Sequence, residues 1–406
     1  MTRPTGPRAL LPVALLTLAA CGPKPAPESA PARQYLYLWT ASTDSTAPDF
    51  LAVLDVTEDS ARYGRLVTTL PAPGLGNYPH HTEHELPADR QLFANGFGSG
   101  ITFVFDLTAP AAPRLAAQFG EVDGMAHPHS FLRLPNGNVL ATYQMHHAGG
   151  AMLPGGLAEL TPAGQVIRSV RDSAAGLDPQ TRVYSAAIVP PLDRIVTTTT
   201  DMDADYPASR QLQLWRLSDL ALLRTFSLPE GPEGGLTAEP RVLADGKTVL
   251  VSTFQCGLYL LSGLETEAPA AQLVASFPRM EGAYCAIPVV AGDFYLVTVP
   301  AWHAVVSLDI RDPAHPREVS RAELGPGDVP HWIALSPDRR RVVVTGYKDM
   351  QHRVVLLRFD PATGQLAVDT RFREEGDSVP GFRMDNKTWP HGGSAPGVPH
   401  GAVFSR

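Results

Sequence analysis

Short apolar runs separated by turn residues recur along the chain from residue 35 to its end. In residues 129–143 an alternating stretch leads into Pro135-Asn136-Gly137 and then into a second, apolar and β-branched stretch. Residues 243–253 and 331–347 repeat this pattern. Alternation with a period of two predicts half-buried strands, and Pro, Asn, Asp and Gly between them predict tight turns. The sequence therefore predicts an all-β protein.

The predicted strands group into four-stranded units of about 40 to 50 residues. Such a repeat is typical of a β-propeller, in which each blade packs on its neighbours around a channel. We expect seven blades. The first would be composite, with outer strands from residues 35–40, 49–56 and 65–70 and an innermost strand from residues 398–405, which would leave no open sheet edge. Two β-sandwiches are the alternative, but they require no such regular period.

The number of sequence positions between the residue that starts a unit and the following turn is the same in several units. Six positions separate that turn from each of His81, His129, Ser185, Cys285 and His331. Because strand side chains alternate faces, equal offsets indicate equal orientation. His400 joins the set because Val398-Pro399-His400 repeats Val329-Pro330-His331. Innermost strands line the channel of a propeller, so we expect these residues around its mouth.

Imidazoles buried side by side lack partners when neutral and repel one another when protonated. A metal ion removes both problems, because neutral imidazole is the commonest metal ligand. A cluster of imidazoles without carboxylates favours copper or zinc over Ca²⁺ or Mg²⁺. His80 must point away from His81 in a regular strand, unless a bulge intervenes. Glu83 and His84 are near enough to support the ligands, or they are solvated loop residues.

The overall composition argues only against nucleic acid as a binding partner. The chain has 406 residues, of which 44% are hydrophobic, enough for a large core. The net charge is -8 and the pI is about 5.9. No basic patch stands out, so we expect no nucleic-acid partner.

Residues 1–20 are expected to be a lipoprotein signal peptide. Two arginines precede an apolar run too short to span a membrane, and Leu18-Ala19-Ala20-Cys21 is typical of a bacterial lipobox. Lipid attachment at Cys21 would anchor the protein in the bacterial cell envelope, at the outer membrane facing the periplasm. Residues 21–34, rich in Pro and Ala, would form a tether, and residues 35–406 the propeller. The alternative is a plain secretory signal with an incidental cysteine.

Other polar residues have more than one explanation. Cys256 and Cys285 could form a disulfide, or one could be a buried thiol and the other a metal-facing thiol. His146 and His147 precede a glycine-rich run and are expected in a surface loop. A solvated turn is expected for three alternating acidic residues without EF-hand spacing, namely Asp201, Asp203 and Asp205.

Several segments match a known family. They are residues 46–56, the His80-His81 pair, residues 103–106 with 112–115, His129, Trp302-His303 and residues 309–317. In these segments the chain resembles the selenium-binding protein and methanethiol oxidase family. It departs from the family pattern after the histidine pair, where Thr82-Glu83-His84-Glu85 replaces Ser-x-Trp-Asn-x-Cys. Gly64 stands where the family has the cysteine tied to selenium, so we do not expect selenium binding.

This resemblance implies a seven-bladed propeller with a copper site held by histidines. By position, the implied ligands are His80, His81, His129 and His400, with His303 a further matching histidine. The register of the strands adds His331 to this set. Family members with oxidase activity convert methanethiol and O₂ to formaldehyde, hydrogen sulfide and hydrogen peroxide.

We therefore expect a copper-dependent oxidase of a small thiol. Copper would bind the sulfur as thiolate and pass electrons to O₂, and His331 or His84 would take the proton. The alternative is a non-catalytic envelope propeller that binds a metal or a partner protein, because a fold does not determine a function. A lactonase-like hydrolase is a third possibility, but it needs acidic ligands in the channel, and only Glu239 is near the start of a unit.

Overall fold

The computed structural model divides the chain into two units, residues 1–32 and residues 33–406. It describes residues 1, 2, 6, 33–148, 151–172, 181–202, 209–266, 268–285, 287–346 and 352–406. Most of the predicted signal peptide, the lipid-attachment residue Cys21 and most of the tether therefore lie outside the described residues. Among the described residues, no helix has the length and apolarity needed to cross a membrane.

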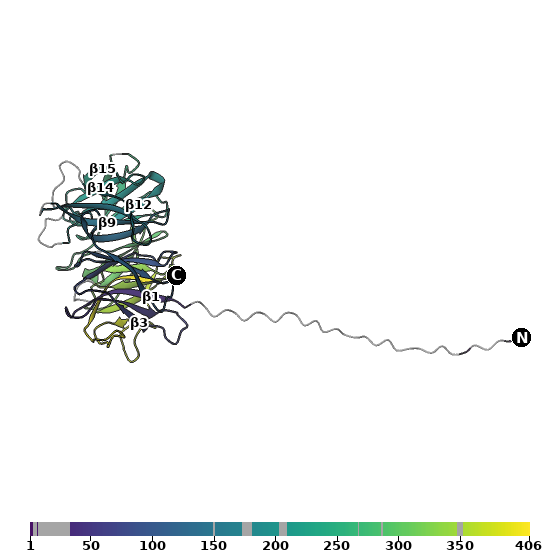
Figure 1. The fold of residues 1–406 in the computed structure, drawn as a ribbon. Helices are drawn as coiled ribbons and strands as arrows, with labels where there is room; N and C mark the ends of the chain where they lie inside the picture. The colour runs from purple at the N-terminus through teal and green to yellow at the C-terminus, as the bar shows by residue number, and fades with distance from the viewer. Residues whose placement is uncertain are drawn as a thin grey trace. The chain divides into compact units, whose positions relative to one another are not determined.

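The strands of residues 33–406 form seven antiparallel sheets within the described ranges (Figure 1), which we number as blades 1 to 7. Each is given from its innermost strand outward. Blade 1 consists of β29 (Gly397–Phe404), β1 (Tyr35–Ser42), β2 (Phe50–Asp55) and β3 (Arg65–Pro71). Blade 2 consists of β4 (Pro79–Thr82), β5 (Gln91–Gly96), β6 (Ile101–Asp106) and β7 (Arg114–Phe119). Blade 3 consists of β8 (Met125–Arg133), β9 (Val139–Ala148), β10 (Ala151–Leu160) and β11 (Val166–Arg171).

The remaining four blades follow the same order. Blade 4 consists of β12 (Ala186–Val189), β13 (Arg194–Thr198), β14 (Gln211–Arg216) and β15 (Leu222–Ser227). Blade 5 consists of β16 (Thr237–Val242), β17 (Val249–Thr253), β18 (Gly257–Ser262) and β19 (Ala270–Ser276). Blade 6 consists of β20 (Val289–Ala291), β21 (Phe294–Val299), β22 (Ala304–Asp309) and β23 (Arg317–Glu323). Blade 7 consists of β24 (Trp332–Leu335), β25 (Arg341–Thr345), β26 (Arg353–Phe359) and β27 (Leu366–Val368), and β28 (Phe382–Arg383) also pairs with β26. Two 3₁₀ turns complete the described elements, η1 (Pro190–Leu192) and η2 (Pro300–Trp302).

The prediction of a seven-bladed propeller closed by a composite blade is confirmed. β29 pairs with β1, so the two ends of the described propeller share one sheet. At its edge the Tyr35 N–H donates to Ser405 Oγ over 2.9 Å, and the Ser405 N–H donates to the Tyr35 carbonyl over 2.7 Å. The alternative of two β-sandwiches is thereby excluded.

Apolar packing between neighbouring blades holds the ring together. One cluster joins blades 2 and 3 through residues such as Phe93 and Phe131, and another joins blades 6 and 7 through Leu296 and Leu357. The side chains of the outermost strands are mostly exposed or half-buried, and in β7 the two classes alternate throughout. The core therefore lies between the blade faces, and the starts of the innermost strands are free to carry a polar site.

Candidate metal centre

Imidazoles from four blades meet where the innermost strands begin. The ring centroids lie 4.4 Å apart for His80 and His81, 4.2 Å for His81 and His129, and 4.1 Å for His80 and His400. The His331 ring lies 5.0 Å from that of His400. All five side chains are buried, with exposed fractions between 0% and 5%. The structure thus brings together five of the six histidines that the sequence analysis proposed as ligands.

Bulges aim these side chains into the channel. The register of β4 against β5 shifts between Pro79 and Thr82, which is the step that contains both His80 and His81. Because a bulge breaks the alternation of faces, neighbouring histidines can turn toward the same point. The pairing of β8 shifts between Pro128 and Phe131, around His129. Period-two reasoning alone would have sent His80 elsewhere.

A belt of polar side chains on the second strands fixes where the innermost strands begin. Thr142 accepts a hydrogen bond from the Ser130 N–H over 3.0 Å and donates to the Tyr184 carbonyl of the next blade over 2.6 Å. Asn95 does the same in blade 2, accepting from the His81 N–H over 2.6 Å and donating to the Pro128 carbonyl over 2.8 Å. The sequence analysis missed this belt.

The belt does have a signal in the sequence. Its members lie 13 or 14 positions after His81, His129, Ser185, Glu239, Cys285 and His331, respectively, and they are Asn95, Thr142, Thr198, Ser252, Thr298 and Thr345. Thr345 donates to the His400 carbonyl over 2.5 Å, which links blade 7 to the last strand. A search for hydroxyl or amide residues at this spacing would have found the supports of the histidines.

Three nitrogen atoms in the cluster are suited to a metal ion. The Nε2 atoms of His80, His81 and His129 are buried and have no hydrogen-bond partner in the part of the chain that the structure describes. One ligand atom from each of these three side chains lies within 4.8 Å of the other two. Because buried polar atoms are normally paired, three neighbouring imidazoles that each have an unpartnered nitrogen fit a metal ion. These residues could therefore hold a metal.

Ser130 orients two of these rings from the other side. Its Oγ lies 3.1 Å from His129 Nδ1 and 3.5 Å from His81 Nδ1. A hydroxyl oxygen has two lone pairs, so it can accept from both Nδ1–H groups and leave both Nε2 lone pairs facing inward. This is the kind of outer contact that fixes the tautomer of a metal-binding imidazole.

Burial keeps the cluster uncharged. It is the main cause that lowers the pKa of His80, His81, His129 and His331 well below its ordinary value, and neighbouring histidines lower it further. Burial also lowers the pKa of His400 to about 3, although the His80 backbone opposes the shift. A neutral imidazole keeps one nitrogen lone pair, so His80, His81 and His129 can bind a cation without releasing protons.

The structure does not bring His303 to the cluster. This residue ends η2 in a left-handed conformation with φ 48°. Its Nδ1 donates to the Asp328 carbonyl over 2.7 Å. Asp328 is also ion-paired with Arg353 and lies three residues before His331. His303 therefore braces the segment that leads to His331.

His84 lies against the far side of the cluster rather than in it. Its ring is parallel to the indole of Trp332, with centroids 4.2 Å apart, and Trp332 in turn contacts His81 at 5.0 Å. His84 Nε2 accepts a hydrogen bond from Arg241 over 2.9 Å. Burial and the charge of Arg241 lower the pKa of His84 well below its ordinary value. With its lone pair occupied, His84 is a poor candidate for the proton acceptor.

The two nearby carboxylates are committed elsewhere. Glu83 accepts from Arg133 over 2.7 Å and from the Phe93 N–H over 3.0 Å. Burial raises the pKa of Glu83 to about 7, against the opposing effect of Arg133. Glu239 accepts from Ser185 and from Arg241, each over 2.7 Å. Neither carboxylate supplies the acidic ligand that a lactonase-like site needs.

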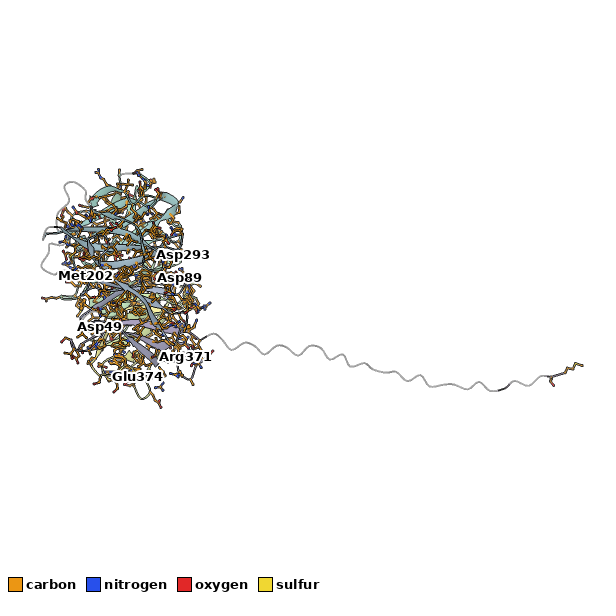
Figure 2. All side chains as sticks on the ribbon, in the orientation of Figure 1. Asp49, Asp89, Met202, Asp293, Arg371 and Glu374 are labelled. Atoms are coloured by element: carbon orange, nitrogen blue, oxygen red, sulfur yellow. A yellow bond between two sulfur atoms is a disulfide. The ribbon has the colours of Figure 1, made fainter. Side chains whose placement is uncertain are left out.

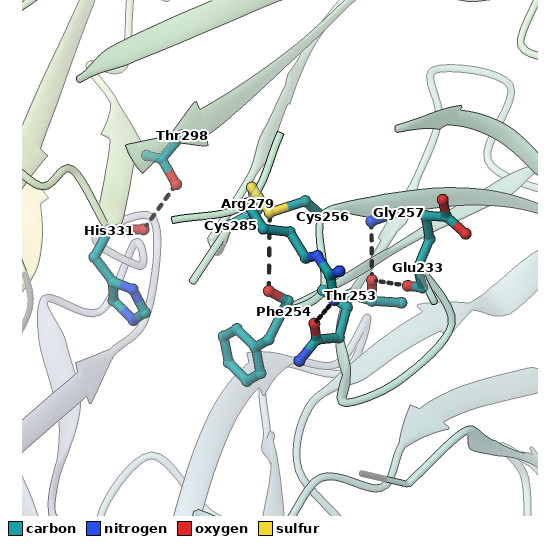
Figure 3. The surroundings of a disulfide bond; sticks show 10 residues. Glu233, Thr253, Phe254, Cys256, Gly257, Arg279, Cys285, Thr298 and His331 are labelled. Atoms are coloured by element: carbon teal, nitrogen blue, oxygen red, sulfur yellow. Dashed lines mark hydrogen bonds between the residues drawn. A yellow bond between two sulfur atoms is a disulfide. The ribbon is translucent and has the colours of Figure 1, made fainter. Parts of the chain in front are cut away.

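The two cysteines form a disulfide, with Cα atoms 5.0 Å apart (Figure 3). Cys285 is therefore not a metal-facing thiol, and the disulfide alternative is the correct one. His146 lies within β9 and is buried, so the prediction of a surface loop was wrong for it, because the β9–β10 hairpin is long. Asp201 is ion-paired with Arg182, and its predicted companions Asp203 and Asp205 lie outside the described residues.

The molecule is thus a seven-bladed β-propeller with a buried imidazole cluster at one mouth of its channel. No family model matches the chain. Among curated proteins it is similar to a methanethiol oxidase from Hyphomicrobium, with 34% identity over 107 residues, and to selenium-binding protein 2 of Arabidopsis thaliana, with 29% identity over 123 residues. These segments span 25% and 27% of this chain, and only 24% and 25% of the two relatives.

Solved structures show the same fold. A hypothetical selenium-binding protein from Sulfolobus tokodaii superposes with a TM-score of 0.73 and 17% identity, covering 93% of this chain and 94% of that protein. The periplasmic gluconolactonase of Pseudomonas aeruginosa has a TM-score of 0.63 and 14% identity, covering 92% and 99%. Together with the curated relatives, these findings confirm that the chain resembles the selenium-binding protein and methanethiol oxidase family.

Proposed function

We propose that this protein is a copper-dependent oxidase of a small thiol. The observation that carries the proposal is a set of three buried histidines, each with an unpartnered Nε2 atom among the described residues and each offering one ligand nitrogen within 4.8 Å of the other two. The partial similarity to a methanethiol oxidase supports it. For methanethiol the balanced reaction takes up one O₂ and one water and releases formaldehyde, hydrogen sulfide and hydrogen peroxide. The carbon loses two electrons, which reduce O₂ to peroxide.

Copper, when bound, would supply a Lewis acid for thiolate sulfur and a path for electrons to O₂. His80, His81 and His129 are the residues that would hold it, with His400 beside them. Ser130 orients two of the rings, and the burial of the cluster keeps bulk water away from the reacting atoms. His331, at the edge of the cluster, is our candidate for accepting the thiol proton, because its ring lies 5.0 Å from that of His400 and outside the group of three histidines that would hold the metal.

The proposal is tested by metal analysis and product detection. The copper-loaded protein is expected to release peroxide and sulfide from methanethiol, whereas the metal-free protein is not. The double variant His81→Ala with His400→Ala is expected to lose stoichiometric copper. A matched control is His315→Ala, because His315 is exposed and contacts only Asp312 among the ion pairs described. Product release no greater than that of metal-free protein would remove the oxidase proposal.

The burial of the cluster also favours a second function, a propeller that stores or carries a metal without catalysis. Five imidazoles with at most 5% exposure offer more donors than an open catalytic site needs. Azide added to the copper-loaded protein distinguishes the two functions. A shifted absorption spectrum indicates an open coordination position and favours the oxidase, whereas an unchanged spectrum favours the carrier.

We also propose that the protein is lipid-anchored at Cys21 in the bacterial cell envelope. The Cys256–Cys285 disulfide supports an oxidising compartment such as the periplasm. Metabolic labelling with a radioactive fatty acid tests the anchor. Label is expected in the native chain and absent from Cys21→Ala, and equal labelling of both would contradict the proposal.

A further inference from the structure

A cavity of about 470 Å³ lies where the innermost strands end, and we call it the lower cavity. Its lining includes residues 131–133 at the end of β8 and Leu335 at the end of β24, whereas the imidazoles lie near the starts of the innermost strands. His84 and Arg241 also line it. The lower cavity is thus a hollow of the channel on the side away from the strand starts.

Arg241 is the centre of a layer of side chains that crosses the channel next to this cavity. It belongs to β16 of blade 5 and donates over 2.8 Å to the carbonyl of Pro288, which leads into blade 6. It also donates over 2.7 Å to Glu239, which accepts from Ser185 beside blade 4. A third bond runs over 2.9 Å to Nε2 of His84, which follows β4 of blade 2. Directly or through Glu239, one guanidinium group links parts of four blades.

Trp332 continues this layer to the other side of the channel. Its indole is parallel to the His84 ring, with centroids 4.2 Å apart, and its Nε1–H donates to the Ala402 carbonyl of β29 over 3.1 Å. The same indole contacts His81 at 5.0 Å and His400 at 5.9 Å between ring centroids. A single indole therefore separates a side chain that lines the lower cavity from two imidazoles of the cluster. We call Arg241, His84 and Trp332 the plug.

The plug is the barrier between the lower cavity and the cluster. The side chain of Arg241 is 15% exposed, whereas Trp332 is 0% exposed. The five imidazoles have at most 5% exposure. A molecule that reaches the unpartnered nitrogens must therefore pass a layer of side chains. On this side of the cluster, that layer consists of one indole and the two side chains that hold it.

The lower cavity suits the passage of a small uncharged molecule. Its lining is mostly apolar, and its arginines are held in ion pairs, Arg133 with Glu83 and Arg241 with Glu239. A charged solute would lose its hydration there without gaining a partner. A diatomic gas has no strong hydration to lose, and it gains contact with the apolar lining.

We propose that the lower cavity is the route by which a small uncharged molecule, such as dioxygen, reaches the imidazole cluster, and that the plug gates this route. This rests on the proposed function, because O₂ is the second substrate of that reaction. The gate is closed in this structure, since hydrogen bonding and stacking connect Arg241 to Trp332 without interruption. A swing of Arg241 and His84 frees one face of the indole and lets it tilt, whereas the imidazoles keep their places.

Carbon monoxide binding to the Cu(I)-loaded protein tests the proposal without turnover, because CO is a small uncharged diatomic that binds Cu(I). Flash photolysis with infrared detection of bound CO measures its rate of entry from solution. Arg241→Ala is expected to raise this rate at least about tenfold, because it removes the group that holds His84 in place. His84→Ala serves if Arg241→Ala does not fold, and the same acceleration is expected.

Arg133→Ala is the matched control. Arg133 also lines the lower cavity, and it pairs with Glu83 and with Asp89, which is labelled in Figure 2. Its loss leaves Glu83 buried without its arginine, as the loss of Arg241 does for Glu239, but the plug stays intact. We expect its rate of CO entry to stay within about twofold of the native rate. Equal acceleration in both arginine variants would indicate a general loosening of the fold and overturn the proposal.

Ile188→Trp tests the route itself, because Ile188 is part of the lining of the lower cavity and a larger side chain narrows it. We expect this variant to slow CO entry at least about threefold. An unchanged rate in this variant or in Arg241→Ala, or no CO binding at all, would overturn the proposal.

These outcomes are distinct from those of the oxidase test. Gated CO entry without product release from methanethiol would remove the oxidase and keep the route as an access path for small uncharged molecules. Product release together with an unchanged rate of CO entry in the plug variants would keep the oxidase and remove the route.

Discussion

The two ends of the channel are built from the same strands, but they differ in whether their buried polar groups have partners. At the starts of the innermost strands, the Nε2 atoms of three histidines are buried without a partner among the described residues. At the other end, a cavity of about 470 Å³ is lined mostly by apolar side chains, with charged ones such as Arg133 and Arg241 among them. There Arg133 binds Glu83 and Asp89, and Arg241 binds Glu239 and His84.

This contrast teaches that a roomy cavity is not by itself the better site for a ligand. Charges that already satisfy one another have little to offer a ligand, whereas buried nitrogens that face one another without partners lack only a cation. Trp332 separates the two environments, with His84 on one face and His81 and His400 at its other contacts. The comparison predicts that changes at the first end alter metal binding and changes at the second alter stability.

The largest effect is expected from removing two of the three orphaned nitrogens. The double variant His81→Ala with His129→Ala should retain no stoichiometric copper or zinc, because one imidazole cannot replace a three-nitrogen site. Elemental analysis after dialysis against a chelator measures this. Native metal content in the double variant would show that the cluster is not the metal site.

The next largest effect is expected at the opposite end. Arg241→Ala leaves Glu239 buried and uncompensated, which should lower the free energy of unfolding by about 3–5 kcal/mol. Urea unfolding of the metal-free protein measures the loss. Metal affinity should stay within about threefold of the native value, since Arg241 contacts no histidine of the cluster. If Arg241→Ala is as stable as the native protein but binds metal less tightly, the expectation that this end affects stability rather than metal binding is wrong.

The pH dependence should also distinguish the two ends. Imidazoles whose pKa lies well below 6.5 bind fewer protons in the folded than in the unfolded state, so acidification below about pH 6.5 destabilises the metal-free protein. Each contributes about 1.4 kcal/mol per pH unit. Glu83 has the opposite sign between 4.5 and about 7, because its raised pKa makes the folded state bind the extra proton. Several imidazoles outweigh one carboxyl group.

Urea unfolding of the metal-free protein between about pH 5 and pH 7 measures this slope. The double variant His81→Gln with His129→Gln should reduce it by about two protons, since two neutral rings are removed. A slope equal to that of the native chain would indicate that these rings are protonated in the folded state.

The smallest effect is expected from the polar belt. Thr142→Val removes a hydroxyl that joins blades 3 and 4 and should cost about 1–2 kcal/mol, because the Ser130 N–H and the Tyr184 carbonyl lose their partner. Thr225→Val is a matched control, since Thr225 Oγ1 has no hydrogen-bond partner in the described residues. Equal stabilities of the two variants would contradict the idea that the polar belt supports the cluster.

The fold and most of the cluster could be predicted because both follow from repetition. Hydrophobic alternation and constant offsets determine the blades and place His81, His129 and His331 at equivalent positions. The position of His80 could not be derived in this way, since it depends on a bulge that alternation does not contain. His303 was matched by resemblance alone, and a left-handed turn directs it to Asp328 instead.

Because β29 closes the ring, the histidine nitrogens that could bind a metal come together in a fixed order during folding. The histidines of blades 2 and 3 can meet as soon as their own neighbouring sheets have formed, with more than half of the polypeptide still to be added or folded. His400 is on the final strand and can join them only when that strand has inserted beside β1. A nascent molecule therefore offers a three-nitrogen site early and the neighbouring fourth ring late. The order of synthesis becomes the order of ligand assembly.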